Sequence, residues 1–173
     1  MGSLRYLAHT QPDLTFSVGY VSRFMQRPTT EHQQAVKRII RYVAGTLDHG
    51  LYCPRCPGAA HFVGYSDSDH ASDIDTSKST SGILFFLSKC LVSWQSVKQQ
   101  VVALSSCETD KHIRVRYHFI RDCLEEWSIK ASYINTKDQL ADLLTKPLGR
   151  IKFFELCSRT GMVQLSHKTT HKT

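Results

Sequence analysis

Apolar residues recur at helical spacing through the N-terminal part of the chain. One run carries Pro12 in its first turn and ends before the next proline, as a helix would. A second run begins at Thr30, where Gln33 would complete a capping box, and it stops at Gly45. The two runs predict a pair of amphipathic helices, which we assign to a helical segment over residues 1–52.

Beyond this segment the pattern favours strands. Apolar, β-branched and aromatic residues gather in short runs at 61–66, 81–87 and 91–95, and a tight turn at 88–89 would join the last two as a hairpin. Such a mixture of helices and strands predicts the α/β class, with an α+β mixed sheet. The remaining expected elements are a helix over 111–127, a strand over 129–134, and short helices over 139–145 and 150–157.

Length and composition fit one globular core. The chain has 173 residues, of which 41% are hydrophobic and 21% charged. Residues 53–165 are therefore expected to form one domain, followed by a polar, disordered tail over 166–173. No apolar run approaches the ~20 residues of a membrane span. The first residues lack the pattern of a secretory signal, so we expect an intracellular protein, cytoplasmic or nuclear, that is not associated with a membrane.

Positive charge is concentrated in the C-terminal third. Residues 1–110 carry 10 Lys and Arg against 9 Asp and Glu, whereas residues 111–173 carry 12 against 6. A basic region of this kind is a plausible footprint for a polyanion such as nucleic acid. A solvated basic face explains the charge equally well, so charge alone leaves both interpretations open.

Six cysteines in a chain without a secretory signal are expected to be reduced thiols. Cys53 and Cys56 have the spacing of a metal-binding pair, but no second pair with the required spacing follows. A surface turn fixed by Pro54 and Pro57 is the favoured interpretation of this stretch.

Acidic residues follow the first predicted strand and recur on two later elements. Asp67 ends an apolar run, Asp110 lies at the expected start of a helix, and Asp142 lies in a later short helix. Acids after a strand usually mark a solvated turn. A calcium loop is excluded because Lys78 stands where the bidentate glutamate would be. Carboxylates from separate elements are also how proteins hold two divalent cations about 4 Å apart for phosphodiester cleavage.

Several stretches form distinctive sequence motifs, among them Gly-Tyr-Ser-Asp-Ser-Asp at 64–69 and Gln-Leu-Ala-Asp-Leu-Leu-Thr-Lys-Pro-Leu at 139–148. They resemble the RNase H domain that ends the Pol polyprotein of copia-type LTR retrotransposons, preceded by the connection from its reverse transcriptase. The resemblance covers nearly the whole chain, and its motifs taken together are very specific. The other stretches are 78–82, 92–99, 103–108, 111–113 and 116–121 and, upstream, 2–7, 11–13, 21–25 and 35–46.

The resemblance implies an RNase H-like fold in which four carboxylates bind two Mg²⁺ ions and cleave RNA in an RNA–DNA hybrid. Asp67 matches the first acid and Asp142 the fourth. Asp110 stands where the family has a glutamate as the second acid, and Glu108 is the acid before it. The third acid has no match, because Asp110 is followed directly by Lys111, which in the family lies well downstream.

The gap after Asp110 decides among the implied functions. On the order of 30 residues or more are missing, through an internal deletion or a splice in the gene model. Our leading hypothesis is a truncated, catalytically defective RNase H-like fragment. The alternatives are an active Mg²⁺-dependent hybrid ribonuclease and a non-enzymatic nucleic-acid-binding module. The residues expected to contact phosphates are Lys130, Lys137, Lys146, Arg150 and Lys152.

Overall fold

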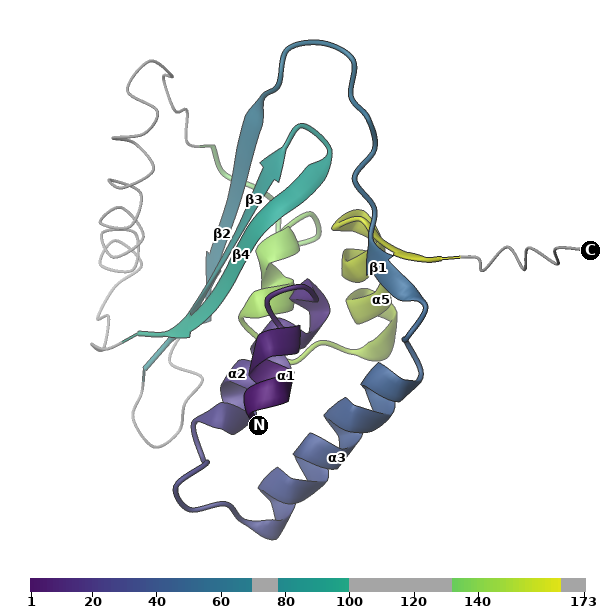
Figure 1. Ribbon diagram of the computed structural model, residues 1–173. Helices are drawn as coiled ribbons and strands as arrows, with labels where there is room; N and C mark the ends of the chain where they lie inside the picture. Colours follow the sequence, from purple (N-terminus) through teal and green to yellow (C-terminus); the bar gives the residue numbers. More distant parts are fainter. Residues whose placement is uncertain (70–77, 100–131, 166–173) are drawn as a thin grey trace, which may run out of the picture.

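The computed structural model describes residues 1–69, 78–99 and 132–165, and its helices lie on one side of a three-stranded sheet (Figure 1). This combination of helices and antiparallel strands confirms the α/β class. No helix within these ranges is long and apolar enough to cross a membrane. The elements are α1 (Gly2–Leu7), α2 (Pro12–Ser22), α3 (Thr30–Ala44), β1 (His49–Leu51), β2 (Phe62–Ser68), β3 (Thr80–Leu87), β4 (Cys90–Lys98), the 3₁₀ helix η1 (Leu140–Leu144), α5 (Arg150–Arg159) and β5 (Met162–Gln164).

The described strands form two antiparallel sheets. The larger has the order β2-β3-β4, and the predicted hairpin between β3 and β4 is confirmed. Its turn contains Ser88 with a φ of 55°, in the left-handed region that tight hairpin turns require. The smaller sheet pairs β1 with β5, so residues 49–51 lie against residues 162–164. This pairing crosses position 52, where the sequence places a domain boundary, and the division into domains stays a prediction.

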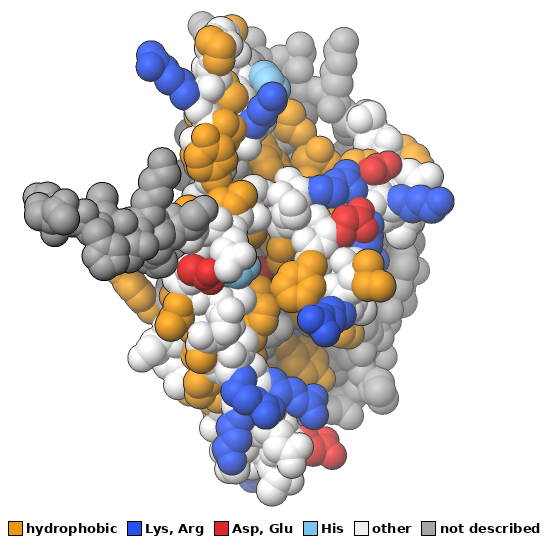
Figure 2. Space-filling model, turned by 90° about the vertical axis from the view of Figure 1, so that its right-hand side faces the viewer, with side chains coloured by type: hydrophobic (Ala, Val, Ile, Leu, Met, Phe, Trp, Pro, Cys, Tyr) orange, Lys and Arg blue, Asp and Glu red, His pale blue; other side chains and the backbone are white. Residues whose placement is uncertain are grey.

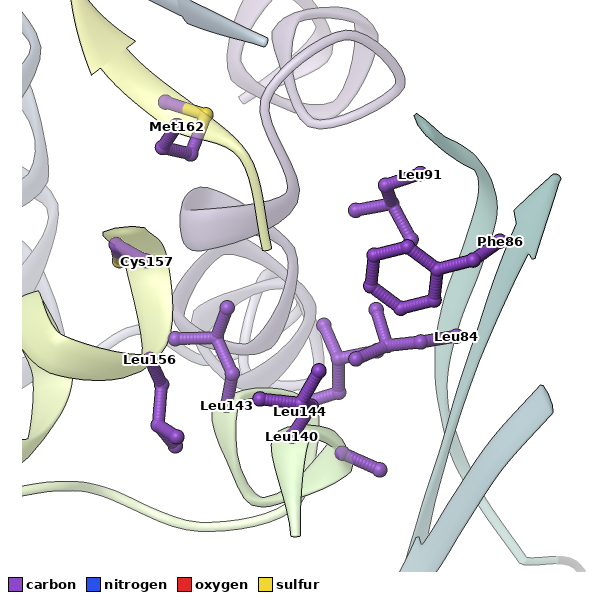
Figure 3. Close-up of a cluster of buried hydrophobic side chains, with 10 residues drawn as sticks. Leu84, Phe86, Leu91, Leu140, Leu143, Leu144, Leu156, Cys157 and Met162 are labelled. Atoms are coloured by element: carbon purple, nitrogen blue, oxygen red, sulfur yellow. The ribbon is translucent and has the colours of Figure 1, made fainter. Parts of the chain in front are cut away.

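The main core lies between the larger sheet and the C-terminal helices (Figure 3). Because side chains alternate along a strand, Leu84 and Phe86 point from β3 toward the same side. The helices η1 and α5 cover that side, where Leu144 and Leu156 are fully buried. The short helix predicted over 139–145 is confirmed as a 3₁₀ helix, and all five of its residues are buried.

A second, smaller core forms between α2 and α3. Leu14, Val18 and Val21 lie on one face of α2 and are buried together with Ile39 of α3. Both predicted N-terminal helices are therefore confirmed. Their apolar stripes associate with each other, which explains why the sequence pattern alone could locate them.

Some local predictions differ from the structure. Helix α3 is capped by Thr29, and its capping box is closed by the ring of His32 in place of Gln33. The short helix α1 was not predicted, because six residues are too few to show a clear period. The strand predicted over 129–134 is wrong for residues 132–134, which have no regular structure. β-Propensity depends on packing against neighbouring strands, so β-branched and aromatic side chains alone do not determine a strand. The predicted helix over 111–127 and the tail over 166–173 lie outside the described residues.

Two side-chain hydrogen bonds attach the N-terminal helices to the larger sheet. The indole Nε1 of Trp94 in β4 donates to the carbonyl oxygen of Ala8 at 3.0 Å. The guanidinium of Arg23 donates to the hydroxyl of Thr80 in β3 at 3.1 Å. Polar side-chain contacts thus join the helical segment to both β3 and β4.

The expectation of reduced cysteines is wrong for one pair. Cys53 and Cys90 form a disulfide, with Cα atoms 4.7 Å apart and 37 residues of separation. The two residues become neighbours only because the loop after β1 reaches the turn between β3 and β4, which spacing along the chain does not reveal. Among the described cysteines, Cys56 is free and exposed, and Cys157 is free and buried.

A buried carboxyl lies between α2 and α3. The side chain of Asp13 is almost fully buried, and its Oδ2 accepts a hydrogen bond from the hydroxyl of Tyr42 at 2.6 Å. Burial raises the pKa of Asp13, while the hydrogen bond from Tyr42 and the nearby His49 act in the opposite direction. Folding therefore disfavours the ionised form of this carboxyl.

We expect Asp13→Asn to gain stability relative to the unsubstituted protein as the pH rises. A carboxyl whose pKa is raised by folding costs stability as the pH climbs from the unfolded value of about 3.8 through the higher folded value. Asparagine does not ionise and still offers an oxygen to Tyr42. The difference in free energy of unfolding should move toward the variant by on the order of 1 kcal/mol between about pH 3 and about pH 7, as measured by urea unfolding.

Tyr42→Phe is the matched control, because it removes the hydrogen bond and leaves the carboxyl in place. It should make the loss of stability with rising pH larger than in the unsubstituted protein. Parallel pH profiles for all three proteins would contradict a raised pKa at Asp13.

Candidate functional site

Two of the three predicted acids meet at one end of the larger sheet. Asp67 is the second-last residue of β2, and Asp142 lies in the middle of η1. Their carboxylates are close enough to share Lys146 as a partner, although they are far apart in the sequence. Asp110 lies outside the described residues, so its position relative to this pair stays a prediction.

Hydrogen bonds hold η1 against the sheet around the two acids. They come from the residues that flank the 3₁₀ helix and from β4, and each joins a side chain to a neighbouring element. The three bonds run from Gln139 Nε2 to Ser66 O (2.9 Å), from Ser96 Oγ to Leu144 O (2.6 Å), and from Thr145 Oγ1 to Asp67 Oδ2 (2.6 Å).

Gly82 allows η1 to approach the sheet. It is the cross-strand neighbour of Asp67 in β3. A Cβ atom at this position would lie 2.8 Å from both Leu144 Cβ and Thr145 Cγ2, and 3.0 Å from the carbonyl oxygen of Ala141. Any other residue would therefore force η1 away from Asp67. Gly82 was not predicted as a positioning residue, although a glycine inside an apolar strand is the signal of such a close approach.

The ammonium group of Lys146 lies beside both carboxylates. Its Nζ is 2.8 Å from Asp142 Oδ1 and 4.0 Å from Asp67 Oδ2. The side chain of Asp142 is 6% exposed, whereas that of Asp67 is 20% exposed, so the pair with Asp142 is the more shielded from solvent. Lys146 therefore has an intramolecular role at this site, and its predicted contact with nucleic acid stays a prediction.

Burial raises the pKa of Asp142. The hydrogen bond and the charge of Lys146 lower it, while the charge of Asp67 raises it again. The negative charge of Asp67 thus disfavours the ionised form of Asp142, and the positive charge of Lys146 favours it. Within the described residues, Lys146 is the cationic group that lies beside both acids.

The donor set of the described residues does not fit a two-metal centre. Within residues 1–69, 78–99 and 132–165 there is no group of three or more His, Cys, Asp or Glu side chains that could hold a metal ion. Magnesium takes near-octahedral oxygen ligands, and two ions need several carboxylates. The Mg²⁺ site implied by the resemblance depends on Asp110 and stays a prediction.

Of the predicted nucleic-acid contacts, Lys137, Lys146, Arg150 and Lys152 lie in the described part of the chain, and their binding to nucleic acid stays a prediction. Figure 2 shows basic side chains in separate groups among acidic, apolar and uncharged ones. Lys152 Nζ lies 3.2 Å from a carboxylate oxygen of Glu155 and also donates to the carbonyl oxygen of Lys137 at 2.8 Å. Lys137 and Arg150 have exposed side chains. Lys130 lies outside the described residues.

We expect Gly82→Ala to destabilise the protein by roughly 1–3 kcal/mol, because the added methyl group overlaps η1. Displacement of η1 should also free Lys146 from its carboxylate partners. Urea unfolding measures the first effect, and the rate of Lys146 acetylation, followed by mass spectrometry, measures the second.

Gly19→Ala is the matched control, since nothing lies within 4 Å of a Cβ at that position of α2. It should leave Lys146 acetylation unchanged and keep or raise the stability, as alanine favours helix. Equal effects of the two substitutions on both measurements would show that Gly82 does not position η1.

Retrovirus-related Pol polyproteins are among the known proteins that match the chain, whereas no family model and no solved structure matches it. It is 33% identical over 216 residues to the retrovirus-related Pol polyprotein from transposon RE1 of Arabidopsis thaliana. It is 36% identical over 210 residues to the retrovirus-related Pol polyprotein from transposon TNT 1-94 of Nicotiana tabacum. These matches include 95% and 91% of this chain but only 15% of each polyprotein, so the chain spans a small part of their length.

The lengths of these alignments reveal a gap in the chain. The match to RE1 extends over 216 residues, but 95% of 173 residues is about 164, so about 52 residues of that polyprotein have no counterpart here. The match to TNT 1-94 extends over 210 residues against about 157, which leaves a similar excess. This excess agrees with the missing segment that the motifs predict, and it is larger than the minimum expected.

A third relative matches without such an excess. The chain is 47% identical over 111 residues to secreted RxLR effector protein 161 of Plasmopara viticola, which is 64% of this chain and 78% of that protein. The length of this match is close to that of the chain up to Asp110, after which the gap is predicted. Taken with the extent and identity of the polyprotein matches, these findings show that the chain belongs to the family of copia-type retrovirus-related Pol polyproteins from transposons, and that it corresponds to a segment of them.

Proposed function

We propose that this chain is a retrotransposon-derived, RNase H-like fragment whose ancestral activity is the cleavage of RNA in RNA–DNA hybrids and whose two-metal catalysis is defective. The single observation that carries the proposal is the excess of about 52 residues in the alignment to RE1, because the third acid of the family belongs to the segment missing after Asp110. The two acids that remain in the described residues lie beside the ammonium group of Lys146. Catalysis by two metals requires carboxylates that are free to bind cations. Here one acid is nearly buried in an ion pair, and the other accepts a hydrogen bond from Thr145.

The gap in the alignments bears on the set of metal ligands. About 52 residues of the RE1 polyprotein have no counterpart in this chain. In the family resemblance, the third acid belongs to a segment that is missing after Asp110. With that acid absent, the ligand set is reduced to Asp67, Asp110 and Asp142. Three carboxylates, of which Asp142 is already paired with Lys146, provide too few ligands to bind two divalent ions well.

We expect the purified chain to leave an RNA–DNA hybrid intact in the presence of Mg²⁺ or Mn²⁺. The assay compares cleavage of a labelled hybrid with a protein-free reaction and with an active hybrid ribonuclease as positive control. The reason for the expected result is the incomplete set of metal ligands.

Two variants distinguish the active alternative from a contaminating nuclease. Asp67→Asn removes a proposed metal ligand, whereas Asp138→Asn removes an exposed acid that pairs with Arg159 away from the site. Cleavage by the unsubstituted chain that persists in Asp138→Asn and disappears in Asp67→Asn would establish an active hybrid ribonuclease. Cleavage that is the same in both variants would come from a contaminant.

Binding of nucleic acid without catalysis is a second candidate function, favoured by the exposure of Lys137 and Arg150 in a basic C-terminal third. Phosphate contacts release counterions, so binding should weaken as salt rises. We expect replacement of both residues by glutamine to weaken binding to a hybrid and to lower the slope of log K against log salt by about 0.7–0.9 per lost contact. Fluorescence anisotropy over a range of salt concentrations measures this.

The control for this experiment is Arg38→Gln, which removes an exposed charge from α3. It should leave the slope unchanged. Binding that does not respond to salt would rule out a phosphate-dependent module, and an equal loss in the control would place the contact on α3.

A further inference from the structure

The loop between β1 and β2 carries two cysteines and is tied down at three points. Figure 1 shows this loop as the blue segment that arches above the ends of the strands. At one end the N–H of Tyr52 donates to the carbonyl oxygen of Gly161 at 2.9 Å. At the other end the N–H of Ser88 donates to the carbonyl oxygen of His61 at 2.7 Å. The third tie is the disulfide between Cys53 and Cys90.

A free thiol lies three residues after the first half of this disulfide. Cys56 is exposed, and only Pro54 and Arg55 separate it from Cys53. Its thiol donates to the carbonyl oxygen of Pro54 at 3.6 Å, so the side chain folds back along the loop toward the preceding residues. Cys53 is exposed and Cys90 is half-buried, so a small thiol in solution can also reach the disulfide. Accessibility and a neighbouring thiol are the two conditions for exchange.

We propose that Cys53, Cys56 and Cys90 form a thiol–disulfide exchange site. The thiolate of Cys56 attacks Sγ of Cys53, a bond forms between these two sulfurs, and the bond between Cys53 and Cys90 breaks. Cys90 leaves as a thiolate and takes up a proton in place of the one that Cys56 released. No electrons are gained or lost, so the step needs no oxidant or reductant.

The two disulfide isomers constrain different parts of the molecule. The pair Cys53–Cys90 joins the arched loop to the turn between β3 and β4, across 37 residues. The pair Cys53–Cys56 would close a small ring within the loop and release that turn. Exchange would therefore convert a link between two elements into a local one, while the hydrogen bond between Ser88 and His61 remains available to hold the turn.

Cys157 provides an internal comparison. It is buried between α5 and the main core, and burial raises the pKa of its thiol to about 12, with a further contribution from Asp13. A thiol that is inaccessible and rarely ionised does not take part in exchange. Replacement of Cys157 by serine should therefore leave the disulfide pattern unchanged.

The experiment maps disulfides in the full chain after free thiols have been blocked with an alkylating reagent. Trypsin cleaves after Arg55, between the two cysteines of the loop, so each isomer gives its own pair of linked peptides. The pair Cys53–Cys90 links residues 42–55 to residues 90–98, and the pair Cys53–Cys56 links residues 42–55 to residues 56–78. Samples are held at about pH 8 in a glutathione buffer and quenched with acid at intervals, because exchange requires a thiolate.

We expect both linked pairs in the unsubstituted chain, and a complete loss of the pair between 42–55 and 56–78 in Cys56→Ser. In Cys90→Ser we expect that pair to be the main disulfide, since Cys56 is then the exposed thiol nearest to Cys53 among the described cysteines. Cys157→Ser should give the same pattern as the unsubstituted chain. The proposal is overturned if Cys56 is fully alkylated at every time in the unsubstituted chain, or if Cys90→Ser leaves Cys53 and Cys56 unlinked. These results do not depend on whether the chain cleaves a hybrid.

Discussion

The close approach of η1 to β3 is the constraint on which the rest of the structure depends. Gly82 has no side chain, so the backbone of η1 and the side chains of Leu144 and Thr145 occupy the space beside the strand. Through this contact the leucines of η1 pack into the main core. The same contact places Asp142 close to Asp67. Packing and the arrangement of acids therefore follow from one small residue, and neither can change without the other.

The sequence predicted those elements of the fold that depend on local patterns of apolar and polar residues. Amphipathic spacing located α2 and α3, and two apolar runs around Ser88 located the hairpin. Features that join distant residues were missed. The disulfide between Cys53 and Cys90 forms across a loop, and the role of Gly82 appears only when η1 is placed against it. Periodicity reports the face that an element buries, but it does not identify the partner that covers that face.

For the candidate site, the family resemblance supplied what local patterns could not. It named Asp67 and Asp142 as members of one site, and the structure places them beside a common cation. The resemblance did not predict that this cation is Lys146. The lysine belongs to the same motif as Asp142, and its charge was expected to contact nucleic acid. Family membership and chemical competence are thus separate questions for this chain. Family membership rests on sequence similarity over most of the length of the chain. Catalytic activity depends on a few carboxylate oxygens, and one of them already accepts a hydrogen bond from Thr145.

The pairing of β1 with β5 has a consequence for how the protein is made. Residues 49–51 find their partners only at residues 162–164, so the first helices and strand leave the ribosome well before the strand that completes their sheet. At a synthesis rate of about 5–20 residues per second, this interval is roughly ten seconds. During that time the N-terminal helices have their own small core but lack the β5 strand that ties them to the C-terminal helix. A deletion between β1 and β5 shortens the interval between the synthesis of the two strands, and it leaves both strands intact.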